Sequence, residues 1–281
     1  MNKAGKESKM KTKKNNVVVY IMLILGAIIM IIPFVWMTIV AFTNQDITYN
    51  MTFKNVINAW SLDNFKNIFT SYNTGRYLFN SMFVAIVTTL GQILICSMSG
   101  FVFARIDFKH KDKIFLLYLA TMMIPIQATI IPQYILMNKM NLINTFTALV
   151  LPGMFSAFGT FLMRQHFANI PKALEEAACL DGAGFIRVFF QVMLPLAKPG
   201  ISVLAVTGFM AAWNDFLWPL LVSSDDTHTT LPLFLSQLQG RWYVNWSELM
   251  AATLISVIPI LIVYLFAQRY FIEGIQNTGI K

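Results

Sequence analysis

The sequence predicts an all-α, polytopic membrane protein with six transmembrane helices, both termini in the cytoplasm, and a cytoplasmic helix between spans four and five. Three observations lead to this prediction. Of the 281 residues, 57% are apolar and only 12% are charged, whereas soluble domains carry about 25% charged residues. The apolar residues gather in runs of roughly 20, the length of a helix that crosses the hydrocarbon core. The basic residues gather on one side of these runs.

Six apolar runs have the required length: 17–42, 77–104, 114–137, 145–163, 201–222 and 249–267. Lysines precede the first run, as in a secretory signal peptide. That run is nevertheless much longer than the roughly 7–15 residues of a signal's apolar region, so we expect a retained anchor. No low-complexity linker or fixed repeat divides the chain. We therefore predict one six-span membrane domain over 17–268, flanked by a basic cytoplasmic tail (1–16) and a second cytoplasmic tail (269–281).

The orientation follows from the basic residues. Sixteen of the 21 lysines and arginines fall in 1–16, 105–113, 164–200 and 268–281. Cytoplasmic loops are enriched in these residues, so we place both termini and the segment 164–200 in the cytoplasm. Topology thus explains the net charge of +8, and nucleic-acid binding is not needed to explain it. We expect no disulfide between Cys96, in the second span, and Cys179, in the cytoplasmic segment.

Two further features concern the loops and the third span. A serine before apolar positions in 61–69 predicts a short surface helix in the outer loop 43–76. The third run contains Pro125 and Pro132. Each proline frees a backbone carbonyl, which needs a partner on a neighbouring helix or in a water-lined cavity. We therefore predict a broken helix that faces a pathway.

The segment 170–200 is the long polar-containing stretch between spans four and five. Pro171 at the first helical position and Asp181-Gly182 at the end predict a short helix, because proline presets φ and glycine adopts the left-handed cap conformation. Its expected apolar stripe consists of Ile170, Leu174, Ala177 and Ala178. A second stripe is expected from Phe185, Ile186, Phe189, Phe190 and Met193. Leu194-Pro195 and Pro199-Gly200 then predict a break before the fifth span.

The short helix is better suited to a protein partner than to lipid. Its polar face carries Glu175 and Glu176 with a single Lys172, whereas a helix on the membrane surface should present lysine and arginine. Acidic groups are repelled by the anionic inner leaflet. The small residues Ala173 and Ala177 also make the helix narrow enough to enter a groove on another protein.

Enzymatic chemistry is not expected in this chain. His110, His166 and His228 fall on three separate segments, so no metal cluster or catalytic triad can be built from them. The sequence also lacks a G-x-x-x-x-G-K-[ST] loop for nucleotide phosphates. We predict no catalytic residue, no metal and no cofactor here; if ATP drives the protein, a partner chain binds it.

One polar group lies inside the fifth span. Asp215 is the only acid well within a span, about 21 Å along a helix that begins at Ile201. The candidate pathway residues are Gln127, Trp213, Asn214, Asp215, Phe216 and Trp218. In one interpretation Asn214 and Asp215 line a cavity beside aromatic rings that stack on a sugar. In the other, they bond to neighbouring helices while the tryptophans form an interfacial belt, which is the commoner behaviour.

The cytoplasmic segment carries a family resemblance. Glu176-Ala177-Ala178, three residues, Gly182, nine residues and Val192-Met193-Leu194-Pro195 resemble the EAA loop of ATP-binding-cassette importer permeases, with Val192 where isoleucine is usual. Flanking segments resemble the carbohydrate branch, specifically the smaller permease of the maltose and multiple-sugar type; they are 141–145, 164–167, 170–171, 180–183 and 213–216. The glycine-containing ending 270–281 is also similar, with less alanine and valine than many relatives.

The resemblance implies a heteromeric importer in the bacterial inner membrane. This chain would pair with a second, related permease, two ATPase subunits that bind ATP and Mg would dock below, and an extracytoplasmic binding protein would deliver sugar. Residues 170–184 of the EAA loop 164–200 would form a coupling helix held by the ATPase. The implied docking residues are Glu175, Glu176, Ala177, Ala178, Asp181, Gly182, Leu194 and Pro195. Two alternatives stay open, a secondary transporter driven by an ion gradient through Asp215 and an interaction scaffold.

Overall fold

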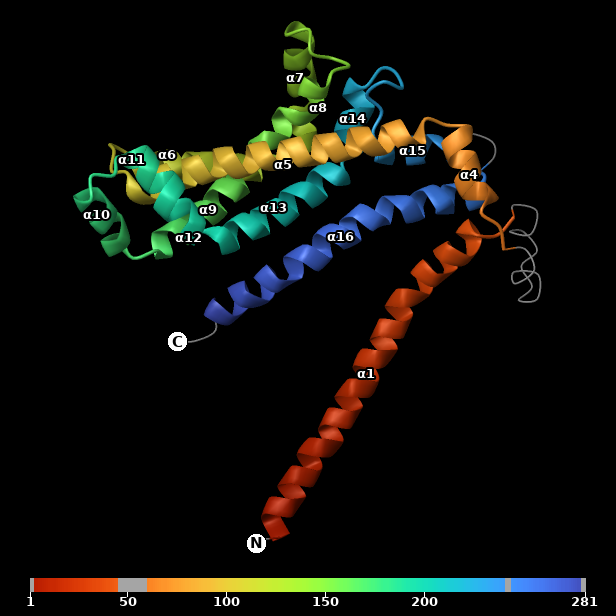
Figure 1. Ribbon diagram of the computed structural model, residues 1–281, viewed down its shortest axis with the longest axis horizontal. Helices are drawn as coiled ribbons and strands as arrows, with labels where there is room; N and C mark the ends of the chain where they lie inside the picture. Colours follow the sequence, from red (N-terminus) through yellow and green to blue (C-terminus); the bar gives the residue numbers. More distant parts are fainter. Residues whose placement is uncertain (1–2, 45–59, 241–243, 279–281) are drawn as a thin grey trace. The chain divides into compact units, whose positions relative to one another are not determined.

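The computed structural model describes residues 3–44, 60–240 and 244–278, and in these residues the chain is helical. The one β interaction among them is an isolated bridge between Thr43 and Trp60. The predicted all-α class is therefore confirmed (Figure 1). The chain forms two compact units, Met1–Tyr72 with Leu238–Ile255 and Asn73–Gln237 with Ser256–Lys281. The last three residues of the predicted tail, 279–281, lie outside the described residues.

The first unit contains α1 (Lys3–Ala41), α4 (Asp63–Thr70) and the first turns of α16 (Trp246–Thr278). Helix α1 continues through residue 16 without a break, so the basic tail and the first apolar run share one helix. Helix α4 confirms the predicted surface helix, with Leu62 instead of Ser61 as its N-cap, so that the helix begins one residue later than expected. The hydroxyl of Ser61 accepts the backbone N–H of Asp63 at 2.9 Å. Buried Asn64 donates its amide to the carbonyls of Ala41 and Thr43, both at 2.9 Å, and so attaches α4 to the end of α1.

The second unit is built around α5 (Thr74–Arg105), which packs against α9 (Ala157–Asn169) and α13 (Lys198–Trp213) (Figure 1). Small residues allow this close packing. A Cβ added to Gly100 would lie 2.7 Å from the Cβ of Met163 and 2.8 Å from the backbone nitrogen of Arg164. A Cβ on Gly159 would lie 2.8 Å from both the sulfur of Cys96 and a methyl of Leu204. Membrane helices commonly pack through small residues in this way, because their backbones can then approach.

The third apolar run is broken, as predicted. It consists of α6 (Lys111–Ala120), the 3₁₀ turn η1 (Thr121–Met123) and α7 (Ile126–Lys139), and the two halves meet at 99°. Pro125 lies at the break with an extended backbone (φ −63°, ψ 138°) and precedes the first residue of α7. The other proline, Pro132, lies inside α7.

The runs 145–163 and 201–222 are not single helices either. The first contains α8 (Phe146–Val150), η2 (Pro152–Met154) and the start of α9, with a bend of 44°. Pro152 limits α8, and Ser156 begins α9 by accepting the N–H of Gly159 at 3.0 Å. The second run is interrupted between α13 and α14 (Leu217–Val222) at Asn214 and Asp215, whose side chains bond to the adjacent backbone. A hydropathy value averaged over a whole apolar run does not detect such short interruptions of the helix.

Three helices in the described part of the chain are long and apolar enough to cross a membrane: Val19–Ala41, Thr74–Arg105 and Trp246–Phe266. Three bent pairs pass the same test together, which gives up to six spans if each pair is one span. The third pair joins Phe185–Leu196 to Lys198–Trp213 at 78°. The predicted number of six is therefore the upper value for these residues, and the break predicted at Pro195 and Pro199 is present.

The loop after α14 is fastened to the beginning of α5. Asn80 is buried and donates its amide to the carbonyls of Thr227 and Thr229 at 3.0 and 2.9 Å. The hydroxyl of Ser81 accepts the N–H of Leu231, the first residue of α15 (Leu231–Gln237), at 2.7 Å. Backbone groups of a non-helical segment are thereby satisfied by side chains of a neighbouring helix.

Candidate functional site

The predicted cytoplasmic helix is α10 (Lys172–Leu180), preceded by Pro171 as its N-cap, one position earlier than predicted. Its end is a Schellman motif. Gly182 has φ +82°, its N–H bonds to the carbonyl of Cys179, and the N–H of Ala183 bonds to the carbonyl of Ala178, both at 3.0 Å. Glycine takes this left-handed conformation without Cβ strain. The turn predicted at Gly182 is therefore confirmed.

Helix α10 has one packed face and one exposed face. Ala178 packs against a buried cluster built by α5, α9 and the following helix, and the side chain of Glu175 is only 18% exposed. Glu176, Ala177 and Leu180 are exposed. The predicted apolar stripe is half wrong, because Leu174 and Ala177 face away from the packed side while Ile170 and Ala178 contribute to it.

Arg105, the last residue of α5, holds this arrangement together. Its side chain is 3% exposed. One guanidinium nitrogen donates to the carbonyl of Phe167, near the end of α9, at 2.6 Å and also to the carbonyl of Ile170. Its Nε lies 3.6 Å from Oε2 of Glu175. A cation is favourable here because the last carbonyls of a helix lack intrahelical partners and carry partial negative charge.

Other charged groups gather near the same end of the second unit. Arg164 bonds to Asp112 at 2.7 Å and lies 4.0 Å above the ring of Phe115. Lys111 bonds to Asp107 at 2.7 Å, and this hydrogen bond, followed by the lysine's charge, lowers the pKa of the Asp107 carboxyl. Exposed pairs of this kind contribute little to stability. Of the basic residues here, Arg105 alone joins the membrane helices to α10 in the described residues.

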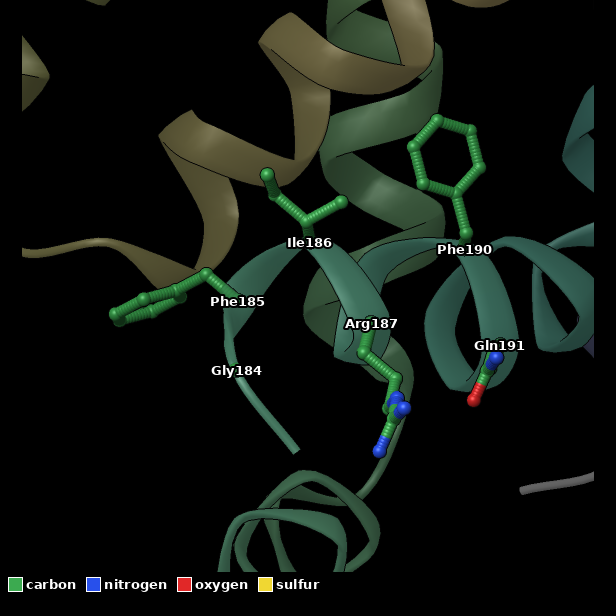
Figure 2. Close-up of a pocket in the computed structure, with 6 residues that line it drawn as sticks. All are labelled: Gly184, Phe185, Ile186, Arg187, Phe190 and Gln191. Atoms are coloured by element: carbon green, nitrogen blue, oxygen red, sulfur yellow. The ribbon is translucent and has the colours of Figure 1, made fainter. Parts of the chain in front are cut away.

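The segment after Gly184 forms a rod of α11 (Phe185–Arg187), the π-helical η3 (Val188–Met193) and α12 (Leu194–Leu196). Only two members of the predicted second apolar stripe, Phe189 and Met193, are buried. Figure 2 shows Ile186 and Phe190 pointing to one side of the rod, with Arg187 and Gln191 pointing to the other. A hollow of about 690 Å³ lies along these residues. Phe185, Ile186 and Phe190 are exposed, so the predicted stripe is correct only in part.

The predicted pathway tryptophans take part in packing. Trp213 is buried, stacks on Phe209 with 5.7 Å between ring centroids, and donates its indole N–H to the carbonyl of Ser256 at 3.2 Å. The indole of Trp218 donates to the carbonyl of Ala148 at 2.8 Å. Both rings therefore hold helices together instead of forming an exposed belt.

The polar pair between the tryptophans bonds locally. Asn214 donates to the carbonyl of Met210 at 2.8 Å, and a carboxylate oxygen of Asp215 accepts the N–H of Trp218 at 3.3 Å. These contacts end α13 and begin α14, and within the described residues they do not reach neighbouring helices. Phe216 is exposed, and Gln127 is exposed in the first turn of α7.

Apolar helices able to cross a bilayer, with a polar helix attached at one end of the bundle, define a polytopic membrane protein that offers a docking surface to a partner. Residues 92–277 match the family model described as the binding-protein-dependent transport system inner membrane component. The chain belongs to this family. It is a permease subunit of an ABC transport system and a multi-pass protein of the inner membrane, and it is not an enzyme.

Curated relatives agree with this assignment. The chain is 38% identical over 222 residues to the arabinooligosaccharides transport system permease protein AraQ of Halalkalibacterium halodurans, covering 79% of this chain and 80% of the relative. It is 31% identical over 265 residues to the lactose transport system permease protein LacG of Rhizobium radiobacter, covering 94% of this chain and 96% of the relative. The predicted resemblance is thereby confirmed at the level of the family.

Solved structures share the fold. A chain of a bacterial ABC transporter involved in the import of the acidic polysaccharide alginate matches with a TM-score of 0.82 at 18% identity, covering 92% of this chain and 97% of that chain. A second structure, of the alginate transporter with an alginate pentasaccharide-bound periplasmic protein, matches with a TM-score of 0.60 at 18% identity, covering 92% and 94%. At this identity the likeness establishes the arrangement of helices alone.

Proposed function

We propose that this permease carries carbohydrate inwards as part of an ATP-driven importer and forms half of its translocation pathway. The relatives support a polyhydroxylated substrate, because their names specify arabinooligosaccharides and lactose. The second half of the pathway is a related permease chain. A sugar-binding protein outside the membrane delivers the substrate, which is supported by the alginate transporter in complex with its loaded periplasmic protein.

The coupling function rests on the two faces of α10. The exposed face presents Glu176 and Ala177, while the opposite face is attached to the membrane helices through Glu175 and Arg105. A surface that transmits force needs both properties: a partner must reach it, and it must not move independently of the bundle. We therefore assign the ATPase contact to the exposed face, with the acidic Glu176 opposite a basic group of the partner. Glu175 serves inside the permease, at the contact with Arg105.

Movement of α10 has two routes into the bundle. The first is Arg105, which connects α10 to the ends of α5 and α9. The second follows the chain through the turn at Gly182 and the rod of α11, η3 and α12, which meets α13 at 78°. Pro195 and Pro199 flank this bend and keep the two helices from merging into one. ATP and Mg bind to two ATPase subunits, and closure of that pair displaces α10 as a rigid body.

We propose fewer residues for contact with the sugar than the sequence predicted. Trp213 and Trp218 position α13 and α14 through their indole hydrogen bonds. The exposed members of the set, Asn214, Phe216 and Gln127, stay candidates for sugar contact. Asp215 shapes the break between the two helices by binding the first turn of α14.

Reconstitution tests this function. The permease is assembled with its partner permease and ATPase in liposomes, and uptake of radiolabelled lactose and arabinotriose is followed with the binding protein outside and ATP inside. We expect uptake that requires both ATP and the ATPase. Uptake driven by a proton or sodium gradient in liposomes without the ATPase would contradict the proposal and favour a secondary transporter.

A further inference from the structure

A polar pocket of about 320 Å³ lies within the first unit, away from the docking helix in sequence and outside every site described above. It is lined mainly by carboxamides and carboxylates, from Asn44, Ser61, Asp63, Asn67, Asn245 and Glu248. Its volume falls within the range of small-molecule sites, about 300–1,000 Å³. We infer that this pocket binds one unit of a neutral sugar.

The walls of the pocket are fixed before any ligand arrives. Buried Asn64, which also lines the pocket, attaches α4 to the end of α1 through two hydrogen bonds of 2.9 Å. On the other side, the side-chain oxygen of Asn245 accepts the N–H of Glu248 at 3.2 Å and caps the start of α16. The amide of Asn67 reaches Glu248 at 3.5 Å. Preorganised polar groups bind a ligand with little further loss of conformational entropy.

The chemistry of the lining favours hydroxyl groups without negative charge. Each carboxamide offers both donors and acceptors, and each carboxylate accepts hydrogen bonds from hydroxyls. Among the residues that the structure describes, the lining includes two carboxylates, Asp63 and Glu248, and no lysine or arginine, so these groups would repel a uronate or a sugar phosphate. The charge of Glu248 acts at short range on neighbouring groups: burial first, and this charge second, raise the pKa of Tyr72.

An aromatic face is available beside the pocket. Trp60 directly precedes Ser61 and forms a bridge with Thr43, which directly precedes Asn44. Ser61 and Asn44 both line the pocket. One face of the indole stacks on Phe42, with 4.5 Å between ring centroids and 8° between planes, while 57% of the residue stays exposed. Aromatic rings of this kind offer a rigid apolar surface beside a polar handle, which suits the apolar face of a pyranose.

The inferred site rests on the proposed carbohydrate import and extends it. The sequence places the loop 43–76 on the outer side of the membrane, where the binding protein would release its sugar. Lactose and arabinooligosaccharides, named for two of the relatives, are neutral sugars. A weak site here would hold a sugar on the outer side of the membrane after its release.

Saturation-transfer NMR on the full chain in nanodiscs tests the inference. The probes are lactose and arabinotriose as neutral sugars, trigalacturonate as an acidic sugar, and calcium chloride as a competitor. We expect saturation transfer to a neutral sugar, none to trigalacturonate, and no competition by calcium. Asn67→Ala should raise the Kd about fivefold, which corresponds to the loss of one neutral hydrogen bond. Trp60→Ala should weaken it at least as much.

Lys66→Ala is the matched control, because Lys66 is exposed on the same helix and does not line the pocket. It should bind sugar like the unmodified chain, and circular dichroism should show equal helix content in every variant used. The inference is overturned by absent transfer to both neutral sugars, by Asn67→Ala binding as tightly as the control, or by calcium displacing the sugar. If reconstituted liposomes import sugar while these results are negative, the pocket alone is refuted; if the chain binds sugar but the assembly imports none, the proposed function fails instead.

Discussion

Arg105 and Glu175 place the docking helix against the end of a membrane-spanning helix. The Nε of Arg105 lies 3.6 Å from a carboxylate oxygen of Glu175, while the same guanidinium donates to the carbonyls of Phe167 and Ile170. The end of α5 therefore meets the end of α9 and the start of α10, more than sixty residues further along the chain, at one buried side chain. If α10 receives force from an ATPase, this contact is one of the two routes by which the force enters the bundle.

Arg105→Gln should uncouple ATP hydrolysis from transport. Glutamine cannot bind two carbonyls and a carboxylate together, so the end of α9 loses its donor and Glu175 its cation. We expect a loss of about 1–3 kcal/mol of local stability at α10, as for a buried hydrogen-bonded group left unsatisfied. The measurement is hydrogen exchange of 171–182 together with the ratio of ATP hydrolysed to sugar imported.

Lys111→Ala is the control for this change. It removes a basic group that pairs with the exposed Asp107 near the same end of the unit, and such pairs contribute less than about 1 kcal/mol. Unaltered exchange and coupling in Arg105→Gln, or an equal effect of Lys111→Ala, would refute the role assigned to Arg105.

Substitution of Gly182 should impair assembly with the ATPase through backbone strain. The space around Gly182 is open, with nothing within 4 Å of an added Cβ, so its φ of +82° is the main obstacle to a side chain. Gly182→Ala should cost about 1–2 kcal/mol, Gly182→Asn less, and Gly182→Asp should add a charge beside the docking face. Co-purification of the ATPase with the permease measures the effect.

Gly184 offers a matched comparison. A Cβ there also meets nothing within 4 Å, but its φ is −75°. Gly184→Ala should co-purify as well as the unmodified chain. If Gly182→Ala and Gly184→Ala behave alike, strain at the turn is not what governs docking.

Gly100→Ala should disrupt packing in the membrane-spanning bundle. The added methyl would meet the Cβ of Met163 and the backbone of Arg164, neither of which can rotate away. Overpacking of this kind costs about 1–3 kcal/mol. Thermal unfolding in detergent should show a lower midpoint for Gly100→Ala, whereas Gly75→Ala, on the same helix with no atom within 4 Å, should not be destabilised. Equal midpoints would mean that α5 and α9 do not pack as described.

Acid should loosen the loop 223–230 more readily when Thr227 loses its hydroxyl. The hydrogen bonds from Thr227 and then Asn144 lower the pKa of Asp225. A carboxyl with a lowered folded pKa stabilises the fold above its unfolded pKa of about 3.9, and this contribution disappears as the pH falls through the folded value. In Thr227→Val the pKa of Asp225 should rise, so protection of this loop against hydrogen exchange should be lost at a higher pH. Identical pH profiles would contradict the assignment.

Asp215→Asn should leave import dependent on ATP. Asparagine keeps an oxygen that can accept the N–H of Trp218, so the start of α14 is preserved. Uptake rates in liposomes should stay within about threefold of the unmodified chain. This corresponds to a change of less than ~0.7 kcal/mol in the activation free energy. If this variant instead abolishes a dependence on the proton or sodium gradient, Asp215 carries an ion and the importer model is incomplete.

Local signals in the sequence were sufficient for some features. Gly182 after an alanine-rich helix predicted the left-handed turn, and Pro125 predicted the break in the third run, because both depend on backbone geometry within a few residues. The role of Arg105 could not be predicted in this way. Its partners lie in α9 and α10, and charge patterning marked it only as a topology signal. An arginine directly at the end of a span, with an acidic residue on the next cytoplasmic helix, was the available clue.

Periodicity predicted the second apolar stripe only in part. Phe189 and Met193 are buried, whereas Phe185, Ile186 and Phe190 are exposed, because an apolar period does not specify which face of a helix a neighbouring helix covers. For Trp213 and Trp218, composition suggested an interfacial belt or a sugar platform, whereas the structure uses their indole N–H groups to join helices. Such pairings depend on which helices are neighbours, and hydropathy does not contain that information.

The position of Arg105 also has a consequence for biogenesis. Its carbonyl acceptors at Phe167 and Ile170 lie more than sixty residues further along the chain. The surface against which α10 packs is therefore incomplete until α9 has been inserted beside α5. A chain that stalls in the translocon after its second span would expose the arginine but no organised docking face. Recruitment of the ATPase would thereby select for permeases whose bundle is already built, and incompletely inserted chains would be left to membrane proteases.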